Sequence, residues 1–279
     1  MQSRRQLIAA LFAAATLLAS PPSSAQKVYA FGVVPQFEAG RLAATWMPIL
    51  AELKRRTGLE FRMQGSPRIP DFEVKFQAGE FDFAYMNPYH AVVAESRAGY
   101  IPLVRDHGRS LFGILLVKKQ SVYQTVEDLA GQTIAFPAPN ALGASLLMRA
   151  DLSTRVGIKF TPLYAQTHTS SYMNVLLGRT AAAGGVMGTL KRQKKVVKDG
   201  LRTIYTTRKM PPHPVVAHPR VGAQIRAQVR QAFIAMQANP QSAALLARVP
   251  IKRIGKASAE DYSPLRLWGL EKFYVTNNP

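Results

Sequence analysis

The chain alternates between two hydrophobic patterns, one typical of buried strands and the other typical of helices with one apolar face. In the first part, short apolar runs predict strands at 27–34, 59–63, 81–85 and 101–105. Between them, apolar residues at helical spacing predict helices at 41–57, 71–78 and 88–97. Such alternation predicts a mainly parallel sheet with helices on both faces.

The later part of the chain repeats this scheme. We predict strands at 112–117, 133–136, 159–164 and 201–206, a small apolar stretch at 181–186, and helices at 141–156, 170–177 and 189–198. The proline-dense segment 210–217 favours extended backbone and is predicted to return to the first unit. Helices at 221–238 and from about residue 263 are expected to pack there. The sequence therefore predicts two α/β lobes, one formed by 26–109 and 215–279 and the other by 110–214.

A junction between a strand and a helix near residue 87 is the first candidate for a binding site. Asn87 suits the position before a helix, and Pro88 suits its first turn. Tyr85 and Asn87 therefore lie where a strand ends and a helix begins, and Gln36 lies in the loop after the first strand. Open α/β sheets bind ligands at this edge, and the free N–H groups of a helix start favour an anion.

The same arrangement recurs twice in the second lobe. Asn140 and Ala141 precede one predicted helix, and the polar bend at 167–171 precedes another. Alternatively, an Asn before a helix is only a cap, and a Tyr at a strand end is part of the core. If helix starts from both lobes face one cleft, they can hold an anion with little need for Lys or Arg. The candidate ligand-binding residues are Gln36, Tyr85, Asn87, Asn140, Ala141, His168, Thr169 and Ser170.

The N-terminus predicts export. Arg4 and Arg5 precede an apolar run at 7–19 and a small-residue stretch that ends at Ala25, which is typical of a secretory signal peptide (1–25) cleaved near Ala25. The run is short for a membrane anchor, the alternative reading. Loss of Arg4 and Arg5 lowers the net charge from +20 to +18. This excess indicates either an anionic partner or a solvated basic surface, and no stripe of basic and aromatic residues indicates nucleic acid.

The sequence offers little for catalysis or metal binding. It contains no cysteine, no nucleophile-elbow, zinc-protease or phosphate-loop motif, and no clustered pair among its 16 acidic residues. The five histidines lack the spacing of metal ligands, and His213 and His218 are expected to be structural. We therefore predict no catalysis, no metal and no cofactor.

Several segments resemble the phosphate-, phosphite- and phosphonate-type substrate-binding proteins of bacterial ABC importers. The resemblance covers about 27–240 and is carried by Phe31-Gly32-Val33, Trp46 and Pro48, the segment 79–88 with Asp-Phe-Ala-Tyr, the segment 129–136 with Leu-Ala-Gly-Gln, 140–147 and 167–170. It implies a type II periplasmic-binding fold, in which two α/β lobes are joined by two crossing segments with the ligand cleft between them. Here the crossings are expected near 107–113 and 209–216. The implied partners are a small anionic solute and an ABC transporter permease.

The resemblance also implies roles for single residues. Tyr85 is similar to the family's ligand-contacting aromatic residue, and His168 to its phosphonate-contacting histidine. The family's Ser-Thr-Ser run is replaced by 139–143, in which Asn140 is the polar residue, and the acid that meets a ligand amine is missing from 184–188. Both departures argue against an aminoalkylphosphonate. The oxyanion would instead be held by backbone N–H groups, Asn140, His168 and Thr169.

Three functions remain open from the sequence. The first is a monomeric periplasmic protein that captures a small oxyanion of the phosphonate, phosphite or phosphate class by hinge closure and delivers it to a permease. The second is a periplasmic sensor subunit that presents its solute to a membrane kinase. The third is a cofactor-synthesis enzyme on the same fold.

Overall fold

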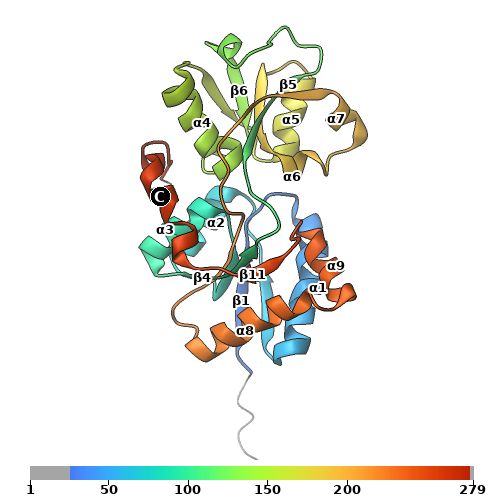
Figure 1. Ribbon diagram of the computed structural model, residues 1–279, viewed down its shortest axis with the longest axis vertical. Helices are drawn as coiled ribbons and strands as arrows, with labels where there is room; N and C mark the ends of the chain where they lie inside the picture. Colours follow the sequence, from blue (N-terminus) through green and yellow to red (C-terminus); the bar gives the residue numbers. More distant parts are fainter. Residues whose placement is uncertain (1–25, 277–279) are drawn as a thin grey trace, which may run out of the picture.

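Two separate β-sheets, each flanked by helices, form two lobes that lie one above the other (Figure 1). The computed structural model describes residues 26–276, so the predicted signal peptide at 1–25 lies outside the described part. Within that part, no helix is long and apolar enough to cross a membrane. The predicted architecture of two α/β lobes joined by two crossing segments is confirmed.

The sheet of the first lobe has the order β11-β4-β10-β3-β1-β2. Strands β1 to β4 run parallel to one another, while β10 inserts antiparallel between β3 and β4, and β11 pairs antiparallel with β4 at the edge. The sequence did not predict β11. The strands are β1 (Val28–Val33), β2 (Glu60–Gln64), β3 (Phe83–Tyr85), β4 (Ile101–Asp106), β10 (Val215–Ala217) and β11 (Ile254–Lys256).

The helices of the first lobe cover this sheet and close its core. They are α1 (Ala39–Thr57), α2 (Ile69–Gln77), α3 (Pro88–Ala98), α8 (Ala223–Met236) and α9 (Pro240–Arg248), followed by the 3-10 turns η4 (Ala259–Asp261), η5 (Ser263–Trp268) and η6 (Leu270–Lys272). The sequence missed α9, whose N-cap Asn239 accepts hydrogen bonds from the N–H groups of Gln241 and Ser242. The helix predicted from residue 263 is wrong. Gly269 has a φ of 66° and divides that segment into short turns.

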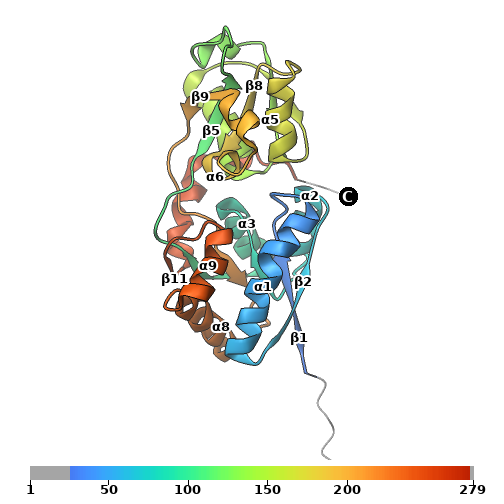
Figure 2. The same ribbon diagram turned by 90° about the vertical axis from the view of Figure 1, so that its right-hand side faces the viewer.

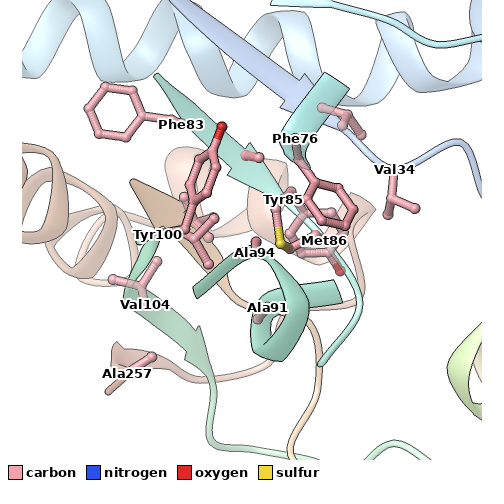
Figure 3. Close-up of a cluster of buried hydrophobic side chains, with 14 of the residues drawn as sticks. Val34, Phe76, Phe83, Tyr85, Met86, Ala91, Ala94, Tyr100, Val104 and Ala257 are labelled. Atoms are coloured by element: carbon pink, nitrogen blue, oxygen red, sulfur yellow. The ribbon is translucent and has the colours of Figure 1, made fainter. Parts of the chain in front are cut away.

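The core of the first lobe combines aromatic and aliphatic side chains, among them Phe83, Tyr85 and Tyr100 (Figure 3). The ring of Trp46 on α1 lies 5.3 Å from Phe31 and 4.8 Å from Tyr85, so the end of β3 is fixed against α1. Packing of this kind restricts the rotamer of Tyr85 before any ligand arrives.

The sheet of the second lobe has the order β7-β6-β8-β5-β9. Its strands are β5 (Gly113–Lys118), β6 (Thr133–Phe136), β7 (Thr161–Tyr164), β8 (Ala182–Val186) and β9 (Leu201–Thr206). The helical elements are η1 (Glu127–Leu129), η2 (Leu142–Leu146), α4 (Leu147–Asp151), η3 (Leu152–Val156), α5 (His168–Leu176), α6 (Met187–Leu190) and α7 (Lys195–Asp199). Elements η2, α4 and η3 are consecutive and form the helix that was predicted at 141–156. The single helix predicted at 189–198 is wrong, because it is divided into α6 and α7.

Element η2 packs closely on the second sheet at two glycine residues. A Cβ atom built on Gly113 would lie 2.0 Å from the carbonyl oxygen of Gly143, and one built on Gly184 would lie 1.9 Å from that of Ala144. Only glycine allows the start of the helix to approach strands β5 and β8 this closely.

The two lobes are connected by the segments 107–112 and 207–214, which run side by side (Figure 2). Leu111 and Met210 exchange two backbone hydrogen bonds of 2.9 Å, which ties the segments together midway. At the lower end, the buried Asp106 accepts hydrogen bonds from the N–H groups of Gly108 and Arg253 and from Nε of Arg109. The hinge is therefore anchored to the first lobe through one carboxylate.

A third connection is made by residues 273–275, which we call the C-terminal strap; in Figure 1 it rises beside α3 toward α4. Asn140 of the second lobe exchanges two hydrogen bonds with the backbone of Val275, of 2.8 and 2.9 Å. Arg149 on α4 donates to the carbonyl of Phe273 at 2.7 Å. On the other side, the ring of Tyr274 packs 5.7 Å from that of Tyr89 on α3. The strap thus contacts both lobes.

Candidate functional site

The cleft between the lobes consists of two adjoining hollows. The larger hollow has about 560 Å³ of empty space, open solvent included, and the smaller about 340 Å³. Both are lined by Val34, Gln36, Leu111, Val186 and His213, so they are continuous with each other. Their walls come from β1, β3 and the crossing segments on one side, and from η2, α5 and α6 on the other.

The first lobe contributes a packed aromatic wall. The rings of Tyr85 and His213 stack at 5.2 Å with 23° between their planes, and Nε2 of Gln36 donates to Nε2 of His213 at 3.0 Å. Burial raises the pKa of Tyr85 to about 12 and holds the pKa of His213 well below its ordinary value. Near neutral pH, Tyr85 is therefore a neutral phenol and His213 a neutral imidazole.

The second lobe contributes a histidine held by the hydroxyl group of Thr189, which also contacts the hydroxyl of Tyr172. Oγ1 of Thr189 lies 3.3 Å from Nδ1 of His168 and 2.6 Å from the hydroxyl of Tyr172, and it donates to the carbonyl of Val186 at 2.9 Å. When the single proton of the threonine hydroxyl is donated to the carbonyl of Val186, Nδ1 of His168 is the donor to Oγ1. Nε2 then carries the free lone pair. Burial lowers the pKa of His168 to about 4.

The start of η2 forms the floor of the smaller hollow. Ala141, Leu142, Gly143 and Ala144 all line it. The first N–H groups of a helix have no partner within the helix, and they carry the positive end of its dipole. This floor is therefore suited to an oxyanion, although it lacks a hydroxyl side chain.

The structure brings together five of the eight predicted site residues. Tyr85 lines the larger hollow, Asn87, Ala141 and His168 line the smaller one, and Gln36 lines both. Asn87 is also a helix cap, since its Oδ1 accepts from the N–H of His90 at 2.8 Å.

The other three predicted residues point elsewhere among the described contacts. Nδ2 of Asn140 donates to Glu73 at 3.0 Å as well as to the C-terminal strap. Thr169 donates a hydrogen bond to Oε1 of Gln193 at 3.2 Å. The N–H of Ser170 donates to Oγ1 of the N-cap residue Thr167, and that hydroxyl donates to Oγ of Ser170. Neither hollow is lined by any of the three. Their assignment as ligand contacts stays a prediction.

The sequence missed the basic residues of the cleft. Arg109, Arg192 and Arg248 line the larger hollow, although Lys and Arg were expected to be unnecessary there. Both Arg109 and Arg192 occur in polar segments that look solvent-exposed in the sequence. His213, interpreted as structural, lines both hollows. Its proline-rich surroundings in the sequence gave no sign of this position.

Acid is expected to destabilise the protein through His168. Its pKa is about 4 in the folded chain and about 6.5 when unfolded, so between these values the unfolded state binds more protons. The free energy of unfolding should fall by about 2 kcal/mol as the pH drops from 7.5 to 5, since each pKa unit corresponds to about 1.4 kcal/mol. Urea unfolding at the two pH values measures this loss. In His168→Gln the loss should be smaller by that amount, and an equal loss in both proteins would contradict the assignment.

The sequence of the chain matches a known protein family. Residues 31–262 match the family described as the periplasmic substrate-binding protein of phosphonate ABC transporters. The chain belongs to this family. Its members are substrate-binding components of transporters and not enzymes, as the sequence predicted, and the family is periplasmic. A search of curated proteins found no significant match.

Solved structures share the fold of this phosphonate-family binding protein at low sequence identity. A binding protein component of a phosphonate ABC transporter from Pseudomonas aeruginosa is 17% identical, with a TM-score of 0.80 over 91% of this chain and 89% of that one. PhnD1 from Prochlorococcus marinus, solved with methylphosphonate, is 14% identical, with a TM-score of 0.80 over 90% and 100%. A protein from Xanthomonas citri, solved with ATP, is 14% identical, with a TM-score of 0.74 over 88% and 98%. These neighbours have the predicted type II fold.

A metal centre finds no support in the described part of the phosphonate-family chain. Residues 26–276 contain no group of three or more His, Asp or Glu residues that could hold a metal ion. The cleft offers neutral hydrogen-bonding groups, helix N–H groups and guanidinium groups, which together suit an anionic solute.

Proposed function

We propose that this protein captures a small phosphorus oxyanion in the periplasm, with phosphonate as the leading class, and passes it to an ABC transporter permease. The observation that carries the proposal is the smaller hollow, where the start of η2 and His168 meet in a buried space. N–H groups at a helix start bind phosphate-like oxygens through both hydrogen bonds and the helix dipole. Family membership supports the transport role over the sensor and enzyme alternatives.

Capture is proposed to proceed by hinge closure about the segments 107–112 and 207–214. The first lobe supplies Tyr85 and Gln36, and the second supplies His168 and the start of η2, so a ligand between them contacts both lobes only when these are close. Neutral His168 offers the lone pair of Nε2, which can accept the proton of a P–OH group. Closure also removes water, which strengthens each of these hydrogen bonds.

Calorimetric titration of the exported chain with methylphosphonate, phosphite, phosphate and sulfate tests this proposal. We expect at least one phosphorus oxyanion to bind with micromolar or lower Kd and sulfate to bind at least tenfold more weakly, because sulfate carries no proton for Nε2 of His168 to accept. His168→Gln should weaken binding of the best ligand about tenfold or more. No measurable binding of any of the three phosphorus compounds would contradict the proposal.

We also propose that the mature protein begins after Ala25 and acts as a monomer. The basic, apolar and small-residue order of residues 1–25 supports export, as does the family's periplasmic location. N-terminal sequencing of periplasmic protein and its elution volume in size exclusion would test the two points. A retained N-terminus or a dimer volume would contradict them.

A further inference from the structure

The larger hollow is lined by positively charged side chains. Binding of a single oxyanion in the smaller hollow does not require them. Arg109, Arg192 and Arg248 line it, and none of its lining residues in the described chain is an Asp or Glu. Arg41 also lies close by, with its guanidinium 4.1 Å from the ring centre of Phe37, a lining residue. A hollow with several guanidinium groups and no carboxylate among its lining residues favours an anionic occupant.

Arg109 is held in place by its own partner behind the wall. Its Nε donates to Asp106 at 3.1 Å, and Asp106 is itself fixed by two backbone N–H groups. The Nη1 atom lies 3.7 Å from where a side chain on Gly188 would begin. Gly188 lines the same hollow, so the terminal nitrogens of Arg109 are next to open space. This is a preorganised guanidinium, which loses little entropy when it binds.

Arg192 faces the same space from the second lobe. Its guanidinium lies 6.0 Å from the ring centre of Phe37, and its Nη2 donates to the carbonyl oxygens of Ala247 and Arg248 at the end of α9. Burial, Arg41 and Arg109 lower its pKa. Like charges are therefore brought together at this point, and an anion between them would reduce their repulsion.

The two hollows are close enough to share one small molecule. Five residues line both, and Thr189, which lines the larger hollow, contacts His168 in the smaller one. Among the described residues that line the two hollows, none is an acidic partner for a cationic ligand group. This agrees with the lack of an acid at 184–188.

We propose that the natural ligand carries a second anionic group, which binds between Arg109 and Arg192 while the phosphorus oxyanion occupies the smaller hollow. The proposal rests on the proposed function for the first of these two groups. The second group is a carboxylate or another phosphonate, since both present oxygens that match a guanidinium.

Matched ligands distinguish these possibilities in calorimetric titrations of the mature chain. Methylphosphonate has one anionic group, 2-aminoethylphosphonate adds a cation, phosphonoacetate adds a carboxylate, and methylenediphosphonate adds a phosphonate. We expect at least one of the two doubly anionic compounds to bind tenfold or more tightly than methylphosphonate, and 2-aminoethylphosphonate to bind most weakly. Whichever of the two binds tighter identifies the second group.

Variants test whether the preference for a doubly anionic ligand depends on Arg192 or only on the net positive charge of the protein. Arg192→Gln should abolish the preference for the doubly anionic ligand, taken as the ratio of its Kd to that of methylphosphonate so that any loss common to both ligands cancels. Arg62→Gln, which changes an exposed residue on β2, should preserve this ratio. Gly188→Asp places a carboxylate beside Arg109 and should shift the preference toward 2-aminoethylphosphonate, which gives a second readout if Arg192→Gln folds poorly.

The outcomes separate the two proposals. Binding of methylphosphonate with no gain from a second anionic group overturns this inference and leaves the proposed function standing. Equal losses for all ligands in Arg192→Gln, or equal loss of preference in Arg62→Gln, also overturn it, since Arg192 would then act through lobe contact or net charge alone. Failure of every compound to bind overturns both.

Discussion

Gly113→Ala is expected to destabilise the second lobe severely and to abolish ligand binding. The new Cβ would lie 2.0 Å from the carbonyl oxygen of Gly143 and 2.9 Å from Cγ2 of Thr207. Since the main obstacle is backbone, relief requires moving η2 away from β5, and η2 forms the floor of the smaller hollow. Overpacking usually costs about 1–3 kcal/mol, and a backbone clash belongs at or above the upper end. Urea unfolding and methylphosphonate titration measure the two effects.

Gly40→Ala provides the matched control. Gly40 lies in the first turn of α1, and nothing lies within 4 Å of a Cβ built there. Alanine at this position should stabilise the protein by about 0.5–1 kcal/mol, because it restricts the unfolded chain and favours the helix. If Gly113→Ala kept the unfolding midpoint and the affinity of the parent, the close approach of η2 to β5 would not be required.

Asp106→Ala is expected to cost about 3 kcal/mol of unfolding free energy and to weaken ligand binding. The substitution leaves two backbone N–H groups at the hinge and the guanidinium of Arg109 without their acceptor. Loss of one partner from a buried charged pair typically costs about 3–5 kcal/mol, and the partial exposure of Arg109 reduces this figure. Thermal unfolding and titration of the variant measure both losses.

Asp199→Ala is the comparison for the loss of a carboxylate that pairs with a cation. Asp199 pairs with Lys195 on the surface of α7, where both side chains are exposed. Such pairs contribute about 0–1 kcal/mol, so this variant should be nearly neutral. Equal stability of the two variants would show that Asp106 does not anchor the hinge.

The parts of the fold that depend on neighbouring residues could be predicted from the sequence. The cap at Asn87 and the end of α1 at Thr57 are local features, and both occur as predicted; Gly58, with a φ of 69°, follows the last residue of α1. The alternation of strands and helices likewise predicted the two lobes, because the spacing of apolar residues along the chain indicates which face of each strand or helix is buried.

The parts that depend on distant residues could not be predicted. Asn140 has the same local pattern as Asn87, yet its side chain bonds to Val275, which is 135 positions away. Its role is set by a tertiary contact that leaves no trace in the flanking sequence. The positions of Arg109 and Arg192 could not be predicted for the same reason. The sequence around a basic residue in a polar segment is similar whether that residue faces bulk water or a cleft.

The contacts of the C-terminal strap are expected to affect the equilibrium between the open and closed forms of the protein. Residues 273–275 bond to Asn140 and Arg149 of one lobe while Tyr274 packs on the other, so separation of the lobes must break these bonds or carry the strap along. In the first case the hydrogen bonds to Asn140 and Arg149 are lost, and in the second the packing of Tyr274 on Tyr89 is lost, so one of these contributions is included in the equilibrium constant between the open and closed forms of the proposed hinge. Apparent affinity scales with the fraction of molecules in the competent form. Small changes in three residues near the carboxyl end can thus set the solute concentration at which the transporter becomes saturated, without altering any atom that contacts the solute.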